Sequence, residues 1–185
     1  MKLERSVAFV AATVGICLAA TGNAETLFGQ ERLERTREIK VAAPLTFSLI
    51  ERVRKATSRF EDVSTAIEEG YRPIPCVSGA NGGAMGIHYV NSRYLTEDNN
   101  SLDIAKPEAV LYEPQMDGSL ELVGVEYVTF EGPAALEGHL LHHHGSPNRY
   151  GLDPYYELHV WAHRENPAGP FVGMNTAVSC EFAGG

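Results

Sequence analysis

The chain has 185 residues, of which 44% are hydrophobic and 21% are charged, and its formal net charge is −9. An acidic chain without a cluster of lysines and arginines repels phosphate groups, which argues against nucleic acid or an anionic membrane surface as a partner. The length suits a single domain with its own hydrophobic core.

The first 24 residues have the features of a cleavable secretory signal peptide. Lys2 and Arg5 precede an uncharged run from Ser6 to Ala20, and Gly22 and Ala24 supply the small residues that signal peptidase requires. We therefore predict cleavage after Ala24 and export to the periplasm or the cell exterior, with no stable membrane insertion afterwards. The apolar run is about fourteen residues, shorter than the roughly 20 of a membrane-spanning helix, so an uncleaved anchor is the weaker alternative.

Cleavage would leave two of the three cysteines. Cys17 would leave with the signal peptide, and we expect Cys76 and Cys180 to form a disulfide bond in an oxidising compartment. A bridge that closes a loop of about 100 residues contributes roughly 4–5 kcal/mol in the chain-entropy model. The alternative is a pair of free thiols with a metal or redox role, although no C-x-x-C motif supports it.

Residues 25–43 are predicted to be a flexible leader, and residues 44–185 a single domain that begins with an amphipathic helix of about twenty residues. Ser48 and Glu51 form a capping box, and Gly70 and Pro73 mark the end of the helix. The apolar face is formed by residues at steps of three and four, namely Leu49, Val53, Ala56, Phe60, Val63 and Ile67.

After Gly70 the pattern is typical of β-structure. The predicted strands are Ile87–Asn91, Ala109–Glu113, Ser119–Phe130 and Tyr155–His163, with a hairpin turn at Met116–Gly118 and a further short strand possible within Phe171–Cys180. Residues 131–154 are predicted to be a long loop outside the core. The predicted fold is α+β, with the N-terminal helix packed on a curved antiparallel sheet or a small β-barrel.

The two long strands carry polar residues on otherwise apolar faces. In the first, Glu126 shares the even-numbered face with Leu120, Leu122, Gly124, Val128 and Phe130, so we expect its carboxylate to point into the core. In the last, His159 shares a face with Tyr155, Glu157, Trp161 and His163. A buried carboxylate without a partner is costly and takes up a proton or finds a cation.

Three predicted strands thus each supply one candidate metal ligand: His88, Glu126 and His159. Two imidazoles and a carboxylate suit a divalent ion, Zn²⁺ with an open position or Fe²⁺, Mn²⁺ or Cu²⁺. Trp161 and Tyr89 would line the adjoining pocket for a small ligand, and Tyr89 or His163 would be the proton donor of a catalytic site. The alternative is a metal-free binding or structural envelope protein in which these groups are hydrogen-bonded core residues.

Other motifs are weaker. His142, His143 and His144 are predicted to lie in an exposed loop that binds metal adventitiously, and His139 is the best candidate for a histidine delivered to the pocket from that loop. Glu126 with Glu157 could act as a carboxylate pair for glycoside chemistry.

Several segments together resemble a family of small exported, mostly bacterial proteins of unknown function with M-G-x-H-Y-V-N and L-H-V-W motifs. The resemblance covers roughly residues 44–180, and it implies an ordered, exported domain. His88 and His159 occupy the two motifs, whereas the triplet His142–His144 departs from the pattern. The segments are Met85–Asn91, Pro107–Pro114, Val123–Tyr127, Tyr156–Trp161, Asn166–Gly169 and Val178–Cys180.

Overall fold

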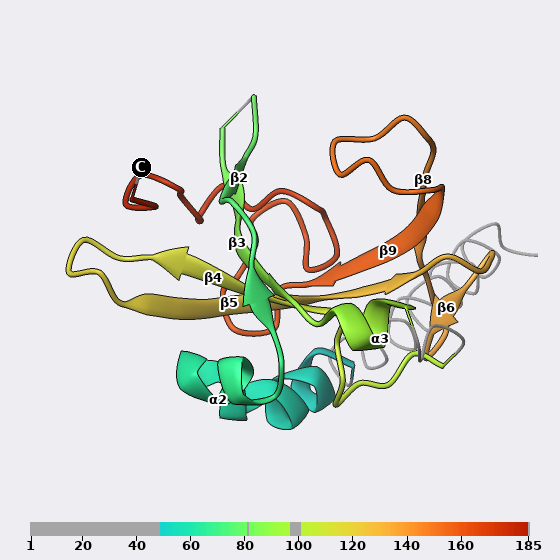
Figure 1. The fold of residues 1–185 in the computed structure, drawn as a ribbon, viewed down its shortest axis with the longest axis horizontal. Helices are drawn as coiled ribbons and strands as arrows, with labels where there is room; N and C mark the ends of the chain where they lie inside the picture. Colours follow the sequence, from blue (N-terminus) through green and yellow to red (C-terminus); the bar gives the residue numbers. More distant parts are fainter. Residues whose placement is uncertain (1–48, 81, 97–100, 185) are drawn as a thin grey trace, which may run out of the picture. The chain divides into compact units, whose positions relative to one another are not determined.

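A computed structural model of the chain describes residues 49–80, 82–96 and 101–184 (Figure 1). All of them belong to one compact unit, Ala42–Gly185. The predicted signal peptide and leader, and Ser48 of the predicted capping box, lie outside the described residues. No helix in the described part of the chain has the length and apolar character needed to span a bilayer.

The centre of the fold is an antiparallel sheet in the order β1-β3-β4-β5-β9-β8, with β2 pairing β3 outside this path. β6 and β7 form a separate two-stranded sheet. The α+β class and the antiparallel sheet are confirmed. The barrel alternative is wrong, because within the described residues the path ends at two very short strands, β1 and β8, that do not pair with each other. The strands are β1 (Arg72–Pro73), β2 (Val77–Ser78), β3 (Ala84–Val90), β4 (Ala109–Pro114), β5 (Leu120–Thr129), β6 (Ala135–Leu136), β7 (His139–Leu140), β8 (His142–His144) and β9 (Tyr155–Val160).

The N-terminal helical region is broken, so the prediction of one continuous helix is wrong. Residues 49–57 are helical and continue into the 3-10 helix η1 (Ser58–Glu61), and α2 (Val63–Glu68) begins only after Asp62. Asp62 is extended, with φ −91° and ψ 107°, and its side chain accepts a hydrogen bond from the backbone N–H of Ser64. Asp62 therefore ends one helical segment and caps the next.

This break changes which apolar residues are buried. Leu49 and Val53 are buried as predicted, but after Asp62 it is Ala66 that is fully buried, while Ile67 is 44% exposed. A single helical period fails here because the chain restarts its helix with a new phase. Gly70, with φ +96°, adopts the left-handed conformation expected at the end.

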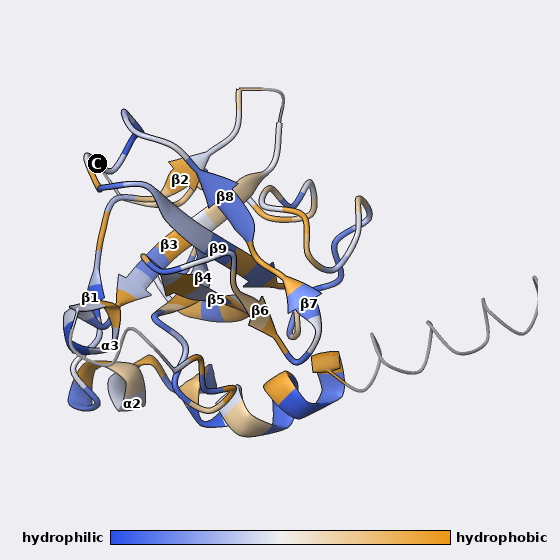
Figure 2. Cartoon of the chain, turned by 90° about the vertical axis from the view of Figure 1, so that its right-hand side faces the viewer, coloured by the Kyte–Doolittle hydropathy of each residue, from blue (hydrophilic) through white to orange (hydrophobic). Residues whose placement is uncertain are grey.

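Two layers cover the sheet. The helices lie on one side and the C-terminal segment lies on the other (Figure 1). Both faces of β4 and β5 are therefore buried, whereas β8, at the edge, is hydrophilic along its length (Figure 2). The helix side is packed by Leu49, Val53, Phe60, Val110, Tyr112, Leu122, Val125, Tyr127, Leu158 and Val160, and the other side by Ala84, Leu111, Val123, Trp161 and Val178.

A β-bulge in β5 changes the side-chain alternation on which the sequence prediction relied. Leu111 of β4 pairs with Gly124, but the next residue, Tyr112, pairs with Leu122, so Val123 is an extra residue in β5.

Because of the bulge, the predicted even-numbered face of β5 does not exist as one face. Leu122 packs on the helix side, and beyond the bulge it is Val125 and Tyr127 that do so. Glu126 is buried, as predicted, but it lies on the opposite side of the sheet from Leu122.

The segment between β5 and β9 contributes to the core, so its description as a loop outside the core is wrong. It contains three short strands, and Leu136 and Leu141 are 3% and 7% exposed. Residues that the sequence placed in a polar connection after β3 form the short helix α3 (Ser92–Thr96). The C-terminal segment supplies an isolated bridge, Ala84 to Asn175, in place of the possible short strand.

The predicted disulfide bond between Cys76 and Cys180 is present and closes a sequence separation of 104 residues. It fastens the C-terminal segment, which covers one face of the sheet, to the connection between β1 and β2. A disulfide is compatible with an exported protein.

Candidate metal centre

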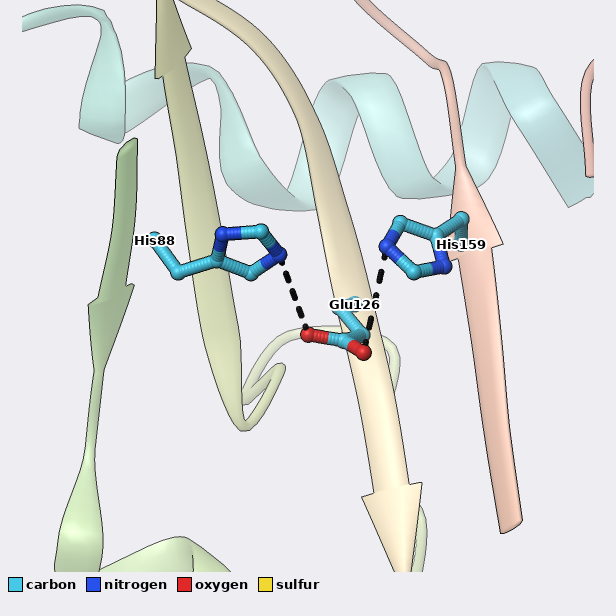
Figure 3. Close-up of side chains that lie close together, drawn as sticks. All are labelled: His88, Glu126 and His159. Atoms are coloured by element: carbon cyan, nitrogen blue, oxygen red, sulfur yellow. Dashed lines mark ion pairs between the residues drawn. The ribbon is translucent and has the colours of Figure 1, made fainter. Parts of the chain in front are cut away.

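Three polar side chains from three strands meet on the sheet face opposite the helices (Figure 3). Glu126 of β5 pairs directly with His159 of β9. His88 comes from β3, on the far side of β4, and its side chain reaches Glu126 across that strand. On β4, His88 pairs with Leu111 and Glu126 pairs with Ala109, so the two side chains approach each other diagonally across that strand.

The donor atoms are close enough for one ion. Nε2 of His88 lies 3.6 Å from Oε2 of Glu126, and Nε2 of His159 lies 3.8 Å from Oε1 of Glu126. One donor atom from each residue lies within 4.8 Å of both others. Two nitrogen ligands of one zinc ion, each bonded at about 2.0–2.1 Å, lie at most about 4.2 Å apart. The structure thus brings His88, Glu126 and His159 together in a group that could hold a metal ion.

The three side chains are buried, and the two imidazoles are poorly satisfied. His88, Glu126 and His159 are 2%, 6% and 2% exposed. Both ring nitrogens of His88 and Nε2 of His159 have no hydrogen-bond partner among the described residues. The distances to Glu126 exceed those of normal hydrogen bonds. Each such buried, unsatisfied group costs about 1–3 kcal/mol.

Burial keeps both imidazoles neutral. Desolvation, with a smaller contribution from His159, lowers the pKa of His88 to about 3. Desolvation also lowers the pKa of His159. A neutral imidazole is the form that coordinates a metal ion, so at neutral pH both rings are ready to do so.

The side chain of a second carboxylate, Glu157 of β9, interacts with that of Glu126. Burial, together with the neighbouring Glu157, raises the pKa of Glu126 well above its usual value. Burial alone would also raise the pKa of Glu157, but His159 and a hydrogen bond from Glu126 hold it below its usual value. Without a metal, the Glu126–Glu157 pair therefore holds a proton more readily than two separate carboxyl groups would.

Glu157 also connects the cluster to the edge of the sheet. Its Oε1 lies 3.6 Å from Nδ1 of His159 and 2.8 Å from Nε2 of His144 in β8. Metal-bound imidazoles commonly have a carboxylate on the second ring nitrogen, and Glu157 has this position.

The histidine run is a strand that pairs with β9, so its assignment to a loop is wrong, although His142 and His143 are exposed as predicted. His144 approaches the cluster through Glu157, with its ring stacked on Tyr155 at 5.0 Å. His139 of β7 is the histidine that the sequence favoured. Its ring packs against Phe171 and not against the cluster. Strand alternation in β8 places His142 and His144 on one face of the strand. The sequence contains this alternation, but the flanking glycines favoured a loop.

Of the predicted pocket residues, one lies beside the cluster and two do not. Trp161 stacks on His159 with a ring separation of 6.2 Å and an interplanar angle of 19°. Tyr89 lies on the helix side, with its ring 5.0 Å from that of Tyr112. β9 ends at Val160, and the chain then bends, so that His163 contacts Thr57 of the helical region at 2.9 Å. Tyr89 and His163 are therefore not proton donors to this cluster.

The sequence analysis did not identify Glu108 or Tyr150, which line a pocket beside His88 and Glu126. Glu108 is 3% exposed and accepts a hydrogen bond from the backbone N–H of Val128 at 2.9 Å. Its position directly before a strongly apolar strand was the available signal.

Comparisons with protein-family models, with curated proteins and with solved structures found no match to this chain. The resemblance to a family of exported proteins therefore stays a prediction.

Proposed function

We propose that this protein binds one divalent transition-metal ion through His88, Glu126 and His159. The observation that carries the proposal is the set of three buried imidazole nitrogens that have no hydrogen-bond partner in the described part of the chain, two of which lie within 4 Å of a carboxylate. A metal ion would satisfy Nε2 of both rings and displace the proton that burial places on Glu126.

The alternative is a metal-free protein with a hydrogen-bonded polar core, and it requires different contacts of the same residues. In that case His88 should donate or accept at least one hydrogen bond, because buried polar groups in proteins are nearly always paired. Neither of its ring nitrogens has such a partner among the described residues, which favours the metal site.

The donor set limits the class of ion. Two imidazoles and one carboxylate suit Zn²⁺, Fe²⁺, Mn²⁺ or Cu²⁺, and the disulfide removes both Cys76 and Cys180 as ligands. Three protein ligands leave at least one coordination position for water or a small ligand, and a bound ion there polarises that ligand or lowers the pKa of the water.

Metal content provides the test. The full chain is purified without an affinity tag, and bound metal is measured by mass spectrometry for the parent, His88→Ala, His159→Ala and Glu126→Gln. We expect about one ion per chain in the parent and a loss of at least ten-fold in affinity in each variant. A double variant, His142→Ala with His143→Ala, is the control for adventitious binding at the exposed histidines of β8 and should keep the ion.

The single tryptophan gives a second readout. Because Trp161 stacks on His159, a paramagnetic ion at this site should quench most of its fluorescence. Quenching that is unchanged in His159→Ala, or a parent protein that takes up no metal, would refute the proposal.

A further inference from the structure

A pocket of about 240 Å³ lies directly beside the proposed metal site. Its wall includes His88 and Glu126 of the cluster. It also includes two leucines, Leu95 of α3 and Leu152 of the segment before β9. The volume corresponds to about eight water molecules at roughly 30 Å³ each, and thus to a small organic molecule. The remaining walls are Ile74, Val90, Glu108, Ala109, Val128, Tyr150 and Tyr155.

The pocket walls are mainly apolar, and the polar groups are concentrated near the cluster. Aliphatic side chains such as Val90, Leu95 and Val128 contribute most of the surface, whereas His88 and two carboxyl groups, Glu108 and Glu126, are the strongly polar members. A ligand that fills this space would bury an apolar body and present one polar end.

The composition of the wall also selects the charge of the ligand. Among the described residues that line the pocket, none is a lysine or arginine. Glu126 and Glu157 already offset the two charges of a divalent ion, and Arg149, whose charge acts on His88, does not line the pocket. An anion would therefore meet the carboxyl group of Glu108 without a further cation on the wall, and a cation would be repelled by the ion. An uncharged ligand avoids both costs.

His88 supplies an observation that points to a ligand independently of the pocket shape. It is 2% exposed, it lines the pocket, and neither ring nitrogen has a hydrogen-bond partner among the described residues. The ring nitrogen that faces Glu126 is Nε2. Because both residues line the pocket, a metal ion bound between them would have its open coordination position next to the apolar cavity.

We propose that this pocket takes an uncharged, mainly apolar molecule of about eight non-hydrogen atoms whose single nitrogen or oxygen donor completes the coordination of the metal ion. The inference rests on the proposed metal site and adds the class of ligand. The apolar body lies between Leu95 and Leu152, and the donor atom lies at the end of the pocket formed by His88 and Glu126.

The test uses the full chain loaded with Co²⁺ and a series of 1-alkylimidazoles from methyl to octyl, at about pH 8, where an imidazole is neutral. Visible absorption of Co²⁺ reports both metal binding and a change of its coordination. Each methylene buried in the pocket should tighten binding about four-fold, up to about the butyl compound, after which the affinity should stop rising.

Two substitutions at one wall residue locate the apolar body. Leu152→Ala enlarges the pocket and should move the limit to longer chains, and Leu152→Phe should move it to shorter chains. Neither should change Co²⁺ affinity, since Leu152 is not a ligand. Leu140→Ala, at a leucine that is 70% exposed, is the matched control and should behave as the parent.

The outcomes separate the two proposals. Co²⁺ binding with a chain-length limit that responds to Leu152 supports the ligand class. Co²⁺ binding with affinities that are independent of chain length, or unaffected by both Leu152 variants, overturns the ligand class and leaves the metal site intact. If the parent takes up no Co²⁺ at the cluster, both proposals are refuted.

Discussion

Replacing His88 by leucine should make the metal-free protein more stable, although it removes a proposed ligand. His88 is 2% exposed and has no hydrogen-bond partner for either ring nitrogen among the described residues. Burial lowers its pKa to about 3, so the substitution removes no charge at neutral pH. An unsatisfied buried imidazole lowers the stability of the metal-free protein, and in our proposal the bound ion offsets this cost.

The magnitude follows from the two unpaired nitrogens. One buried polar group without a partner costs about 1–3 kcal/mol, and imperfect packing of the new side chain costs a similar amount at most. We therefore expect the free energy of unfolding of His88→Leu to exceed that of the parent by about 1–3 kcal/mol in the presence of a chelator. The assay is urea-induced unfolding followed by Trp161 fluorescence, with an unchanged m-value as evidence that only stability has changed.

His163→Leu is the matched control, because His163 is also a largely buried histidine and burial lowers its pKa to about 4. It differs in having a partner, Thr57, at 2.9 Å. Loss of the His163–Thr57 hydrogen bond in His163→Leu should lower the free energy of unfolding by about 0.5–1.5 kcal/mol. If His88→Leu instead destabilises the metal-free protein by as much as this control does, His88 is a hydrogen-bonded core residue and our reasoning about the site fails.

Two further predictions concern groups around the site, and a third concerns the disulfide bond. Glu157→Gln should weaken metal affinity about 10–100-fold, measured by competition with a chelating dye, whereas His139→Ala should leave it unchanged. Burial raises the pKa of Glu108 from 4.5 to about 7, so its contribution to stability is complete below about pH 4.5 and is lost as the pH rises through 7. In denaturant titrations, the difference in the free energy of unfolding between Glu108→Gln and the parent should therefore grow by up to about 3 kcal/mol between pH 4.5 and 7. A difference that does not change with pH would contradict a raised pKa of Glu108. Replacing Cys76 and Cys180 together by serine should lower the free energy of unfolding by about 4–5 kcal/mol, and a loss below 1 kcal/mol would show that the long loop is already constrained without the bridge.

The burial of His88 and His159 could be predicted because strand alternation is local. His159 lies in a strand that keeps the period of two from Tyr155 to Val160, so the sequence pattern correctly placed it on a face with Glu157. His88 follows the glycine at position 86, which has φ +88° and whose Cβ would lie 2.5 Å from the backbone oxygen of Tyr112. A glycine is needed at such a position because the backbone of the neighbouring strand lies so close. The glycines before His88 in the sequence indicated a close approach of this kind.

The errors arise where the chain changes phase. One extra residue, Val123, inverts the alternation of β5, and Asp62 restarts the helix with a different buried face. In both places the spacing of apolar residues looks continuous, because each side of the break is regular on its own. Glu126 was assigned correctly as buried only because both faces of β5 are covered.

The arrangement of the strands explains why the ligands are long side chains. Neighbouring strands lie about 4.8 Å apart, so the backbones of β3 and β5, with β4 between them, are about 10 Å apart. Histidine and glutamate can bridge that distance across β4, where His88 pairs with Leu111 and Glu126 pairs with Ala109, whereas aspartate is one methylene shorter. Because all three ligands stand on hydrogen-bonded strands in fixed register, the separation of their Cα atoms is set by the sheet. The site can therefore close on an ion only by side-chain rotation, which favours ions that accept imidazole and carboxylate at short distances over the larger Ca²⁺ with its need for six or more oxygen ligands.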